Sequence, residues 1–158
     1  MRKTAQREDI RDLILDAVDG LLATYGYGKM TMEDVARQVG IGKGTIYLHF
    51  PSKQELVLAH IDRIAETVVG KLEEIAASPD PIDRRLRRML VIRVLHRFDS
   101  VAHYSRSLGE LLSSVRSPLM ARRQAYFEKE AAVLEGVLRE GARLGTLDCA
   151  DPRTASFV

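Results

Sequence analysis

The fold is set by residues 31–53, which read T-M-E-D-V-A-R-Q-V-G-I-G-K-G-T-I-Y-L-H-F-P-S-K. The pattern predicts two short helices joined by a glycine turn and followed at once by the start of a third helix. Thr31 suits the cap of the first helix, and Asp34, three residues later, adds negative charge to its first turn. The apolar residues of this helix recur at helical spacing and are expected to face the core: Val35, Ala36 and Val39.

Glycines mark the turn between the two helices. Gly40 suits the left-handed residue that ends a helix, and Ile41 can plug the turn. Gly42 then opens a second helix that runs through His49. Helix, glycine turn and helix form the arrangement by which many proteins place a short helix in the major groove of DNA.

The same residues resemble the tetracycline-repressor (TetR) family of bacterial transcription regulators. The matching segments are T-x-x-D-V-A at 31–36 and G-I-G-K-G-T-I-Y-L-H-F at 40–50, continued by Pro51, Ser52, Lys53, Glu55 and Leu56. The resemblance implies an all-α homodimer with a three-helix, helix-turn-helix DNA-binding head and a helical ligand-binding and dimerisation body. It implies a repressor that binds a palindromic double-stranded DNA operator and releases it when a small-molecule effector enters the C-terminal half.

Composition limits the other classes. The chain has 158 residues, 46% of them hydrophobic, which is enough for a packed core. Its formal net charge is only +2, so DNA binding must depend on where the charges lie. The single cysteine, Cys149, cannot form an internal disulfide, and no spacing indicates a metal site or cofactor. A polar start and no apolar run near the roughly 18 residues that span a bilayer predict a cytoplasmic protein without a membrane partner.

Helical periodicity extends along the chain. Outside the motif, the predicted helices cover residues 7–25, 52–77, 81–98, 101–115 and 117–144. Ser52 with Glu55 forms a capping box for the second of these helices, whereas Ser117 followed by Pro118 indicates a separate helix start.

These helices divide the chain into two domains. We predict a helix-turn-helix DNA-binding domain at 1–51 and a helical regulatory domain at 52–158, with 52–77 as a long connecting helix. Family members usually continue with two further helices, so the resemblance implies a chain that is truncated at its C-terminal end.

The residues predicted to meet DNA lie on or beside the second motif helix. Lys43 can donate to guanine O6 and N7, and the Thr45 methyl can contact a thymine methyl. Gly44 allows a close approach, and Tyr47 and His49 are placed to donate to phosphate oxygens. The complete predicted set is Thr31, Gly42, Lys43, Gly44, Thr45, Tyr47, Leu48, His49 and Lys53.

The resemblance supports two of these positions in particular, because residues at Tyr47 and Lys53 commonly contact phosphates in the family. Each residue also has a structural alternative. Tyr47 could simply be packed, Lys43 could be an ordinary surface lysine, and His49 could serve helix-end packing as readily as phosphate binding. Leu48 stands where many members have a polar or aromatic residue, so base reading there is expected to be weak.

The resemblance places an effector pocket among the helices between Pro81 and Gly145. A mainly apolar pocket with polar accents is expected, although Arg93 with His96 could receive an anion. The candidate lining residues, most of which are expected to be core, are Met89, Arg93, His96, Phe98, Tyr104, Leu108, Leu112, Tyr126 and Phe127.

Other readings fit less well. The segment G-I-G-K-G-T at 40–45 is similar to a phosphate-binding loop, but Gly44 stands where that loop requires Ser or Thr. The histidines are scattered and no carboxylate pair accompanies them, so we expect no enzyme. A module that binds only proteins would expose apolar residues on the motif helix. The arginines of 84–97 favour a solvated helix face with local ion pairs over a second anion-binding surface.

Overall fold

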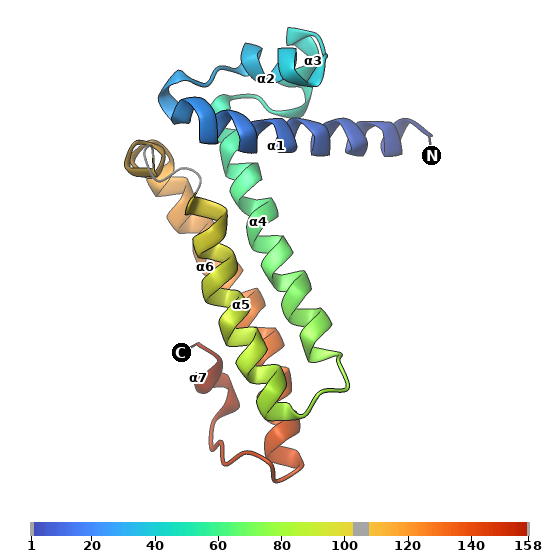
Figure 1. Ribbon diagram of the computed structural model, residues 1–158, viewed down its shortest axis with the longest axis vertical. Coiled ribbons are helices and arrows are strands. Elements are labelled where there is room, and N and C mark those ends of the chain that lie inside the picture. Colours follow the sequence, from blue (N-terminus) through green and yellow to red (C-terminus); the bar gives the residue numbers. More distant parts are fainter. Residues whose placement is uncertain (1, 103–107, 158) are drawn as a thin grey trace. The chain divides into compact units, whose positions relative to one another are not determined.

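The computed structural model describes the backbone of residues 2–102 and 108–157, and the side chains of 9–96, 109 and 113–157. Every regular element within these ranges is helical, which confirms the predicted all-α fold. The helices are α1 (Arg2–Lys29), α2 (Met32–Val39), α3 (Lys43–His49), α4 (Lys53–Ala76), α5 (Ile82–Ala102), α6 (Leu108–Arg143) and α7 (Pro152–Ser156) (Figure 1).

The chain forms two compact units. Unit 1 contains residues 1–63 and 101–116, and unit 2 contains residues 64–100 and 117–158. Helix α4 passes without interruption from one unit to the other, at Arg63 and Ile64. The predicted division at 51 and 52 therefore falls just before this helix, and it stays a prediction.

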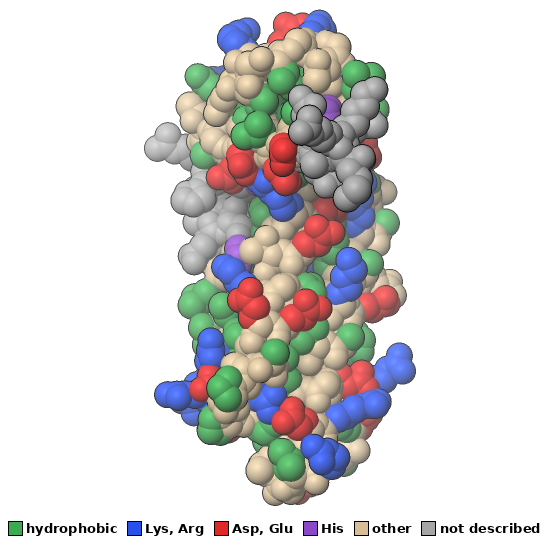
Figure 2. All heavy atoms as spheres, turned by 90° about the vertical axis from the view of Figure 1, so that its right-hand side faces the viewer, with side chains coloured by type: hydrophobic (Ala, Val, Ile, Leu, Met, Phe, Trp, Pro, Cys, Tyr) green, Lys and Arg blue, Asp and Glu red, His purple; other side chains and the backbone are tan. Residues whose placement is uncertain are grey.

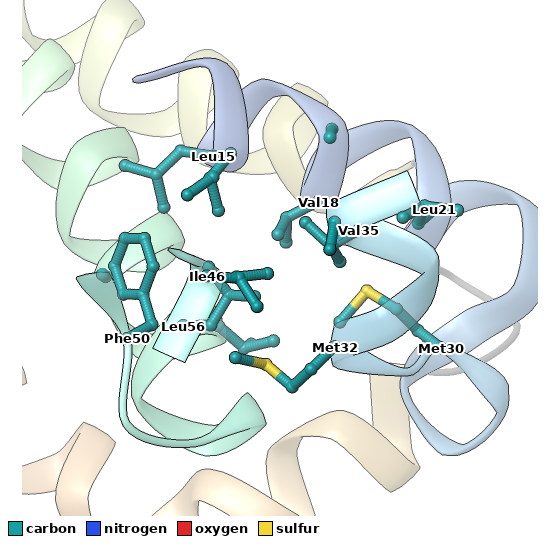
Figure 3. Close-up of a cluster of buried hydrophobic side chains, with 14 of the residues drawn as sticks. Leu15, Val18, Leu21, Met30, Met32, Val35, Ile46, Phe50 and Leu56 are labelled. Carbon is teal, nitrogen blue, oxygen red and sulfur yellow. The ribbon is translucent and has the colours of Figure 1, made fainter. Parts of the chain in front are cut away.

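The core of unit 1 holds the motif together. Figure 3 shows side chains from four helices meeting there, among them Val18 from α1, Val35 from α2, Ile46 from α3 and Leu56 from α4. Phe50, at the end of α3, is also buried in this cluster. Because each of the short helices contributes a buried apolar residue, none of them has to be stable alone.

A glycine interrupts α1 before the motif begins. Gly26 has φ 74° and ψ 169°, a conformation that breaks the helical path and that only glycine adopts easily. The regular part of α1 therefore ends at Tyr25, as predicted. One further helical turn follows Gly26 and ends at Lys29.

Both ends of α2 are capped. Thr31 caps its start as predicted, and Asp34 completes a reciprocal capping box, with 3.1 Å from the Asp34 amide to Thr31 Oγ1 and 3.1 Å from the Thr31 amide to Asp34 Oδ2. Gly40 is left-handed, with φ 76°. The Ile41 amide donates to the Ala36 carbonyl at 3.0 Å, and the Gly40 amide donates to the Arg37 carbonyl at 3.2 Å, which completes a Schellman motif.

Unit 2 is built from α4 after residue 63, α5 up to residue 100, α6 from residue 117 onward, and α7. Its buried residues come from three helices: Val68, Leu72 and Ile75 from α4, Ile82 and Met89 from α5, and Leu134 and Val137 from α6. Within unit 2, α5 and α6 pack against each other in this core (Figure 1). The Arg85 guanidinium is buried here and binds the Glu140 carboxylate at 2.8 Å and the Ala76 carbonyl at 2.7 Å.

The predicted helix start at Ser117 is wrong. Helix α6 continues through Pro118 from Leu108, so the predicted helices 101–115 and 117–144 do not exist as separate elements. Helix α5 likewise extends past the predicted end at 98 to Ala102. Proline has no amide to bond the carbonyl four residues earlier, here that of Ser114. The Gln54 side-chain amide donates to that carbonyl at 3.3 Å, which replaces the missing partner.

Within the described ranges, no helix combines the length and the apolar character needed to cross a membrane.

The conformation of Gly40 yields a stability prediction. Replacement of Gly40 by Ala should lower the free energy of unfolding by about 1–2 kcal/mol, because a Cβ atom is disfavoured in the left-handed region. A Cβ at this position would meet no atom within 4 Å, so the cost is conformational and not steric. The matched control is Gly44→Ala, where the space is equally open but the residue is helical. Urea unfolding of both variants tests this, and an equal effect would contradict it.

Buried His60 yields a pH prediction. Burial lowers the pKa of His60, although the Asp19 carboxylate, 3.5 Å from its Nε2, favours the charged form. In the unfolded chain the His60 imidazole takes up a proton near pH 6.5, whereas in the folded protein it does so only at lower pH. The free energy of unfolding should therefore fall as the pH drops below about 6.5. His60→Leu should make this fall shallower between about pH 7 and 5 in urea titrations. Identical slopes in the two proteins would refute the assignment.

Candidate functional site

Helix α3 has one buried and one exposed face. Ile46 and Phe50 point into the core, as Figure 3 shows. Lys43 is exposed, and the exposed fractions of Tyr47 and Leu48 are 45% and 73%. The seven-residue helix thus presents a mixed polar and apolar surface to solvent.

The glycines at the start of α3 are not required by packing. A Cβ on Gly44 would meet no atom within 4 Å, and one on Gly42 would lie 3.8 Å from Thr45 Oγ1. Gly42 caps the helix without any side-chain hydrogen bond. The helix therefore begins with bare backbone that a ligand can approach closely.

Lys43 is bound by the neighbouring helix. Its Nζ donates to Oε1 of Glu33, in the first turn of α2. This hydrogen bond is the main cause that lowers the pKa of Glu33 and raises the pKa of Lys43. Both groups are therefore charged near neutral pH, and Lys43 enters any encounter with DNA already paired.

Lys53 has internal partners as well. Its Nζ donates to the carbonyls of Tyr27 at 2.8 Å and Met30 at 3.1 Å, and it lies 4.3 Å from the centre of the Tyr27 ring. These contacts tie the start of α4 to the segment before α2. A phosphate contact by Lys53 stays a prediction, and it requires the ammonium to share or exchange these carbonyls.

The nine predicted DNA-binding residues all lie in unit 1, on α3 or beside the starts of α2 and α4. Thr45, His49 and Lys53 are half-buried. The others are exposed to solvent: Thr31, Gly42, Lys43, Gly44, Tyr47 and Leu48. Thr31 Oγ1 is engaged in the capping box, where it also donates to Asp34 Oδ2 at 2.6 Å.

The predicted effector residues are only partly brought together. Arg93 and Phe127 line a hollow of about 440 Å³ in unit 2, whose other lining residues are Met120, Arg123, Gln124, Glu128 and Phe157. Met89 is instead packed in the core. His96 is half-buried, and so is Tyr126, whose hydroxyl is buried and has no hydrogen-bond partner among the described residues. Tyr104 and the side chains of Phe98, Leu108 and Leu112 lie outside the described residues.

A buried ion pair lies beside this hollow. Arg93 Nε donates to Glu130 Oε2 at 3.1 Å, and the Glu130 side chain is completely buried. Sequence reasoning missed Glu130. A signal was available, because this acid lies at helical spacing within the apolar row that includes Leu134 and Val137, where a charge needs a partner.

Two arginines of α5 form the predicted local ion pairs on an exposed face, because Arg84 and Arg88 both contact the Asp80 carboxylate. Arg85 and Arg93 depart from that prediction: their side chains are largely buried, and they pair with Glu140 and Glu130 of α6. In the space-filling view of one face, basic and acidic side chains are interspersed (Figure 2). In the part of the chain with described side chains, no three His, Cys, Asp or Glu residues gather in a way that could hold a metal ion.

Comparison with known proteins identifies the motif. A family profile described as "Bacterial regulatory proteins, tetR family" matches residues 14–60. The nucleoid occlusion factor SlmA of Alteromonas mediterranea is 30% identical over 142 residues, which cover 89% of this chain and 70% of that protein.

Solved structures share the fold. A transcriptional regulator from Cytophaga hutchinsonii superposes with a TM-score of 0.79 at 25% identity, over 92% of this chain and 74% of that chain. The SmeT–triclosan complex superposes with a TM-score of 0.64 at 23% identity, over 94% and 73% of the two chains. The match at 14–60 contains α2, the Gly40 turn and α3 whole, and the 30% identical relative extends the likeness over 89% of the chain. This chain therefore belongs to the tetR family of bacterial regulatory proteins and is a DNA-binding transcription regulator.

Proposed function

We propose that this protein is a ligand-responsive repressor that binds a palindromic operator as a homodimer and releases it when a small molecule binds unit 2. The orientation of α3 is the observation that supports the DNA-binding part of this proposal. Its apolar residues Ile46 and Phe50 are buried, while Lys43, Gly44 and Tyr47 are exposed to solvent.

Each exposed group has a role in this proposal. The amino-terminal end of α3 enters the major groove, where Lys43 donates to a guanine and the bare backbone at Gly44 allows close approach. Tyr47 and His49 donate to phosphates on either side of the groove. Leu48, which is well exposed, can contact a thymine methyl.

A two-fold dimer explains how so short a helix can be specific. Two copies of α3 read two half-sites, one helical turn or a related distance apart, and the operator is palindromic because the dimer is symmetric. The head at 1–51 then supplies the contacts and the regulatory domain at 52–158 holds the two heads at the required spacing.

The hollow beside Arg93 and Phe127 is the effector site in this proposal. Met120, Phe127 and Phe157 supply its apolar wall, and the remaining lining residues are charged or polar, so it suits a small molecule that carries polar groups. SmeT is a fold relative whose structure holds triclosan, a small molecule. An effector in this hollow would shift α5 and α6, which share the core of unit 2 with the second half of α4. Because α4 is one continuous helix, the displacement would reach the head. Release requires that the effector bind the DNA-incompetent state more tightly, by about 1–3 kcal/mol.

A change at Lys43 tests the DNA-binding surface. The operator is first selected from a pool of randomised duplexes with the wild-type protein. Lys43→Ala should then weaken binding to the selected duplex by about 5- to 150-fold, because one base contact and one charge are lost. The measurement is fluorescence anisotropy at several KCl concentrations. Lys71→Ala, which removes the same charge from an exposed site on α4, is the matched control. Equal losses in both variants would contradict a role for α3.

A reporter gene under the selected operator tests both regulation and the effector site. Expression should be low with the protein present and should rise with some members of a small-molecule library. Phe127→Ala should abolish the response to those compounds while repression persists, because the aromatic wall of the hollow is lost. Leu144→Ala removes an exposed apolar side chain of unit 2 that does not line the hollow, and it should respond normally. Compounds that act equally on both variants would place the effector elsewhere, and higher expression with the protein present would indicate an activator.

A further inference from the structure

Glu33 and Lys43 link the two helices of the motif on their exposed side. Glu33 belongs to the first turn of α2 and Lys43 is the first residue of α3. The exposed fractions of their side chains are 55% and 63%, and the Lys43 ammonium donates directly to the Glu33 carboxylate. A negative charge therefore accompanies the one cation that begins the recognition helix.

Folding does not require this carboxylate. The start of α2 is capped by Thr31 and Asp34, and the turn before α3 is held by backbone hydrogen bonds around Gly40. An exposed ion pair contributes little to stability, because water and salt screen it. Removal of Glu33 should therefore leave the fold of unit 1 intact.

Near DNA, the Glu33 carboxylate has two opposite effects on binding. It repels phosphates, so it weakens binding to any duplex regardless of sequence. It can also accept a hydrogen bond from the N4 amino group of cytosine, which no phosphate can offer. The adjacent ammonium donates to the O6 and N7 acceptors of guanine. Together the two side chains present an acceptor and a donor side by side, a pattern that matches cytosine and guanine edges in the major groove.

We propose that Glu33 is a specificity-determining residue of the DNA-binding surface, which restrains the Lys43 ammonium from indiscriminate phosphate contacts and reads a cytosine beside the guanine that Lys43 reads. This inference rests on the proposed placement of α3 in the major groove. Glu33 lowers the affinity for every duplex and lowers it least for the operator, so its contribution is to the ratio of the two affinities.

The experiment compares wild type with Glu33→Gln and Glu33→Ala in the full chain. Each protein is titrated against the selected operator duplex and against a random-sequence duplex of equal length, by fluorescence anisotropy at several KCl concentrations. Glu73→Gln removes one negative charge from an exposed site on α4 and is the matched control. Selection from the randomised pool is repeated with Glu33→Ala. Urea unfolding midpoints check that all variants fold as the wild type does.

Both Glu33 variants should bind the random duplex more tightly than wild type, and the ratio of operator to random affinity should fall about tenfold. The sites selected by Glu33→Ala should lose the preference for one C·G pair in each half-site. Glu73→Gln should change neither the ratio nor the selected sites. If both affinities rise equally in the Glu33 variants, so that the ratio of operator to random affinity stays constant, the inference is overturned. In that case Lys43→Ala should still weaken operator binding, and the proposed function stands. If wild-type protein selects no common sequence, the proposed role of α3 fails, and the inference fails with it.

Discussion

A helix of seven residues forms too few internal hydrogen bonds to persist in water, so α3 exists only because its inner face is packed. Ile46 and Phe50, one turn apart, are both buried against residues of α1, α2 and α4. Burial of each such side chain contributes about 1.5–3 kcal/mol. This packing fixes which side of α3 faces solvent, and every proposed DNA contact depends on that orientation.

The two lysines at the start and just after the end of α3 both have partners within unit 1. Lys43 is paired with Glu33, and Lys53 donates to backbone carbonyls next to the Tyr27 ring. A net charge of only +2 for the whole chain agrees with this restraint. In the proposed complex, this pairing would weaken the attraction to arbitrary DNA and leave a larger share of the binding energy to base contacts.

Unit 2 contains a buried ion pair. Glu130 is completely buried and its charge is compensated by Arg93, whose side chain also lines the hollow. Removal of one partner from such a pair is far more costly than its net contribution to stability. An effector that competes for the Arg93 guanidinium would therefore act on a group that the packing of α5 against α6 depends upon.

The sequence alone determined the local features: the Thr31 cap of α2, the left-handed Gly40, the spans of α2 and α3, and the inward direction of Val35 and Ala36. Each depends on residues within one or two helical turns, so spacing and side-chain type are sufficient. Tertiary structure decided the rest. Pro118 does not end a helix, Met89 belongs to the core, and the ammonium groups of Lys43 and Lys53 have protein partners. These outcomes depend on groups from other helices, such as Gln54 at the Ser114 carbonyl, which become neighbours only when the chain has folded.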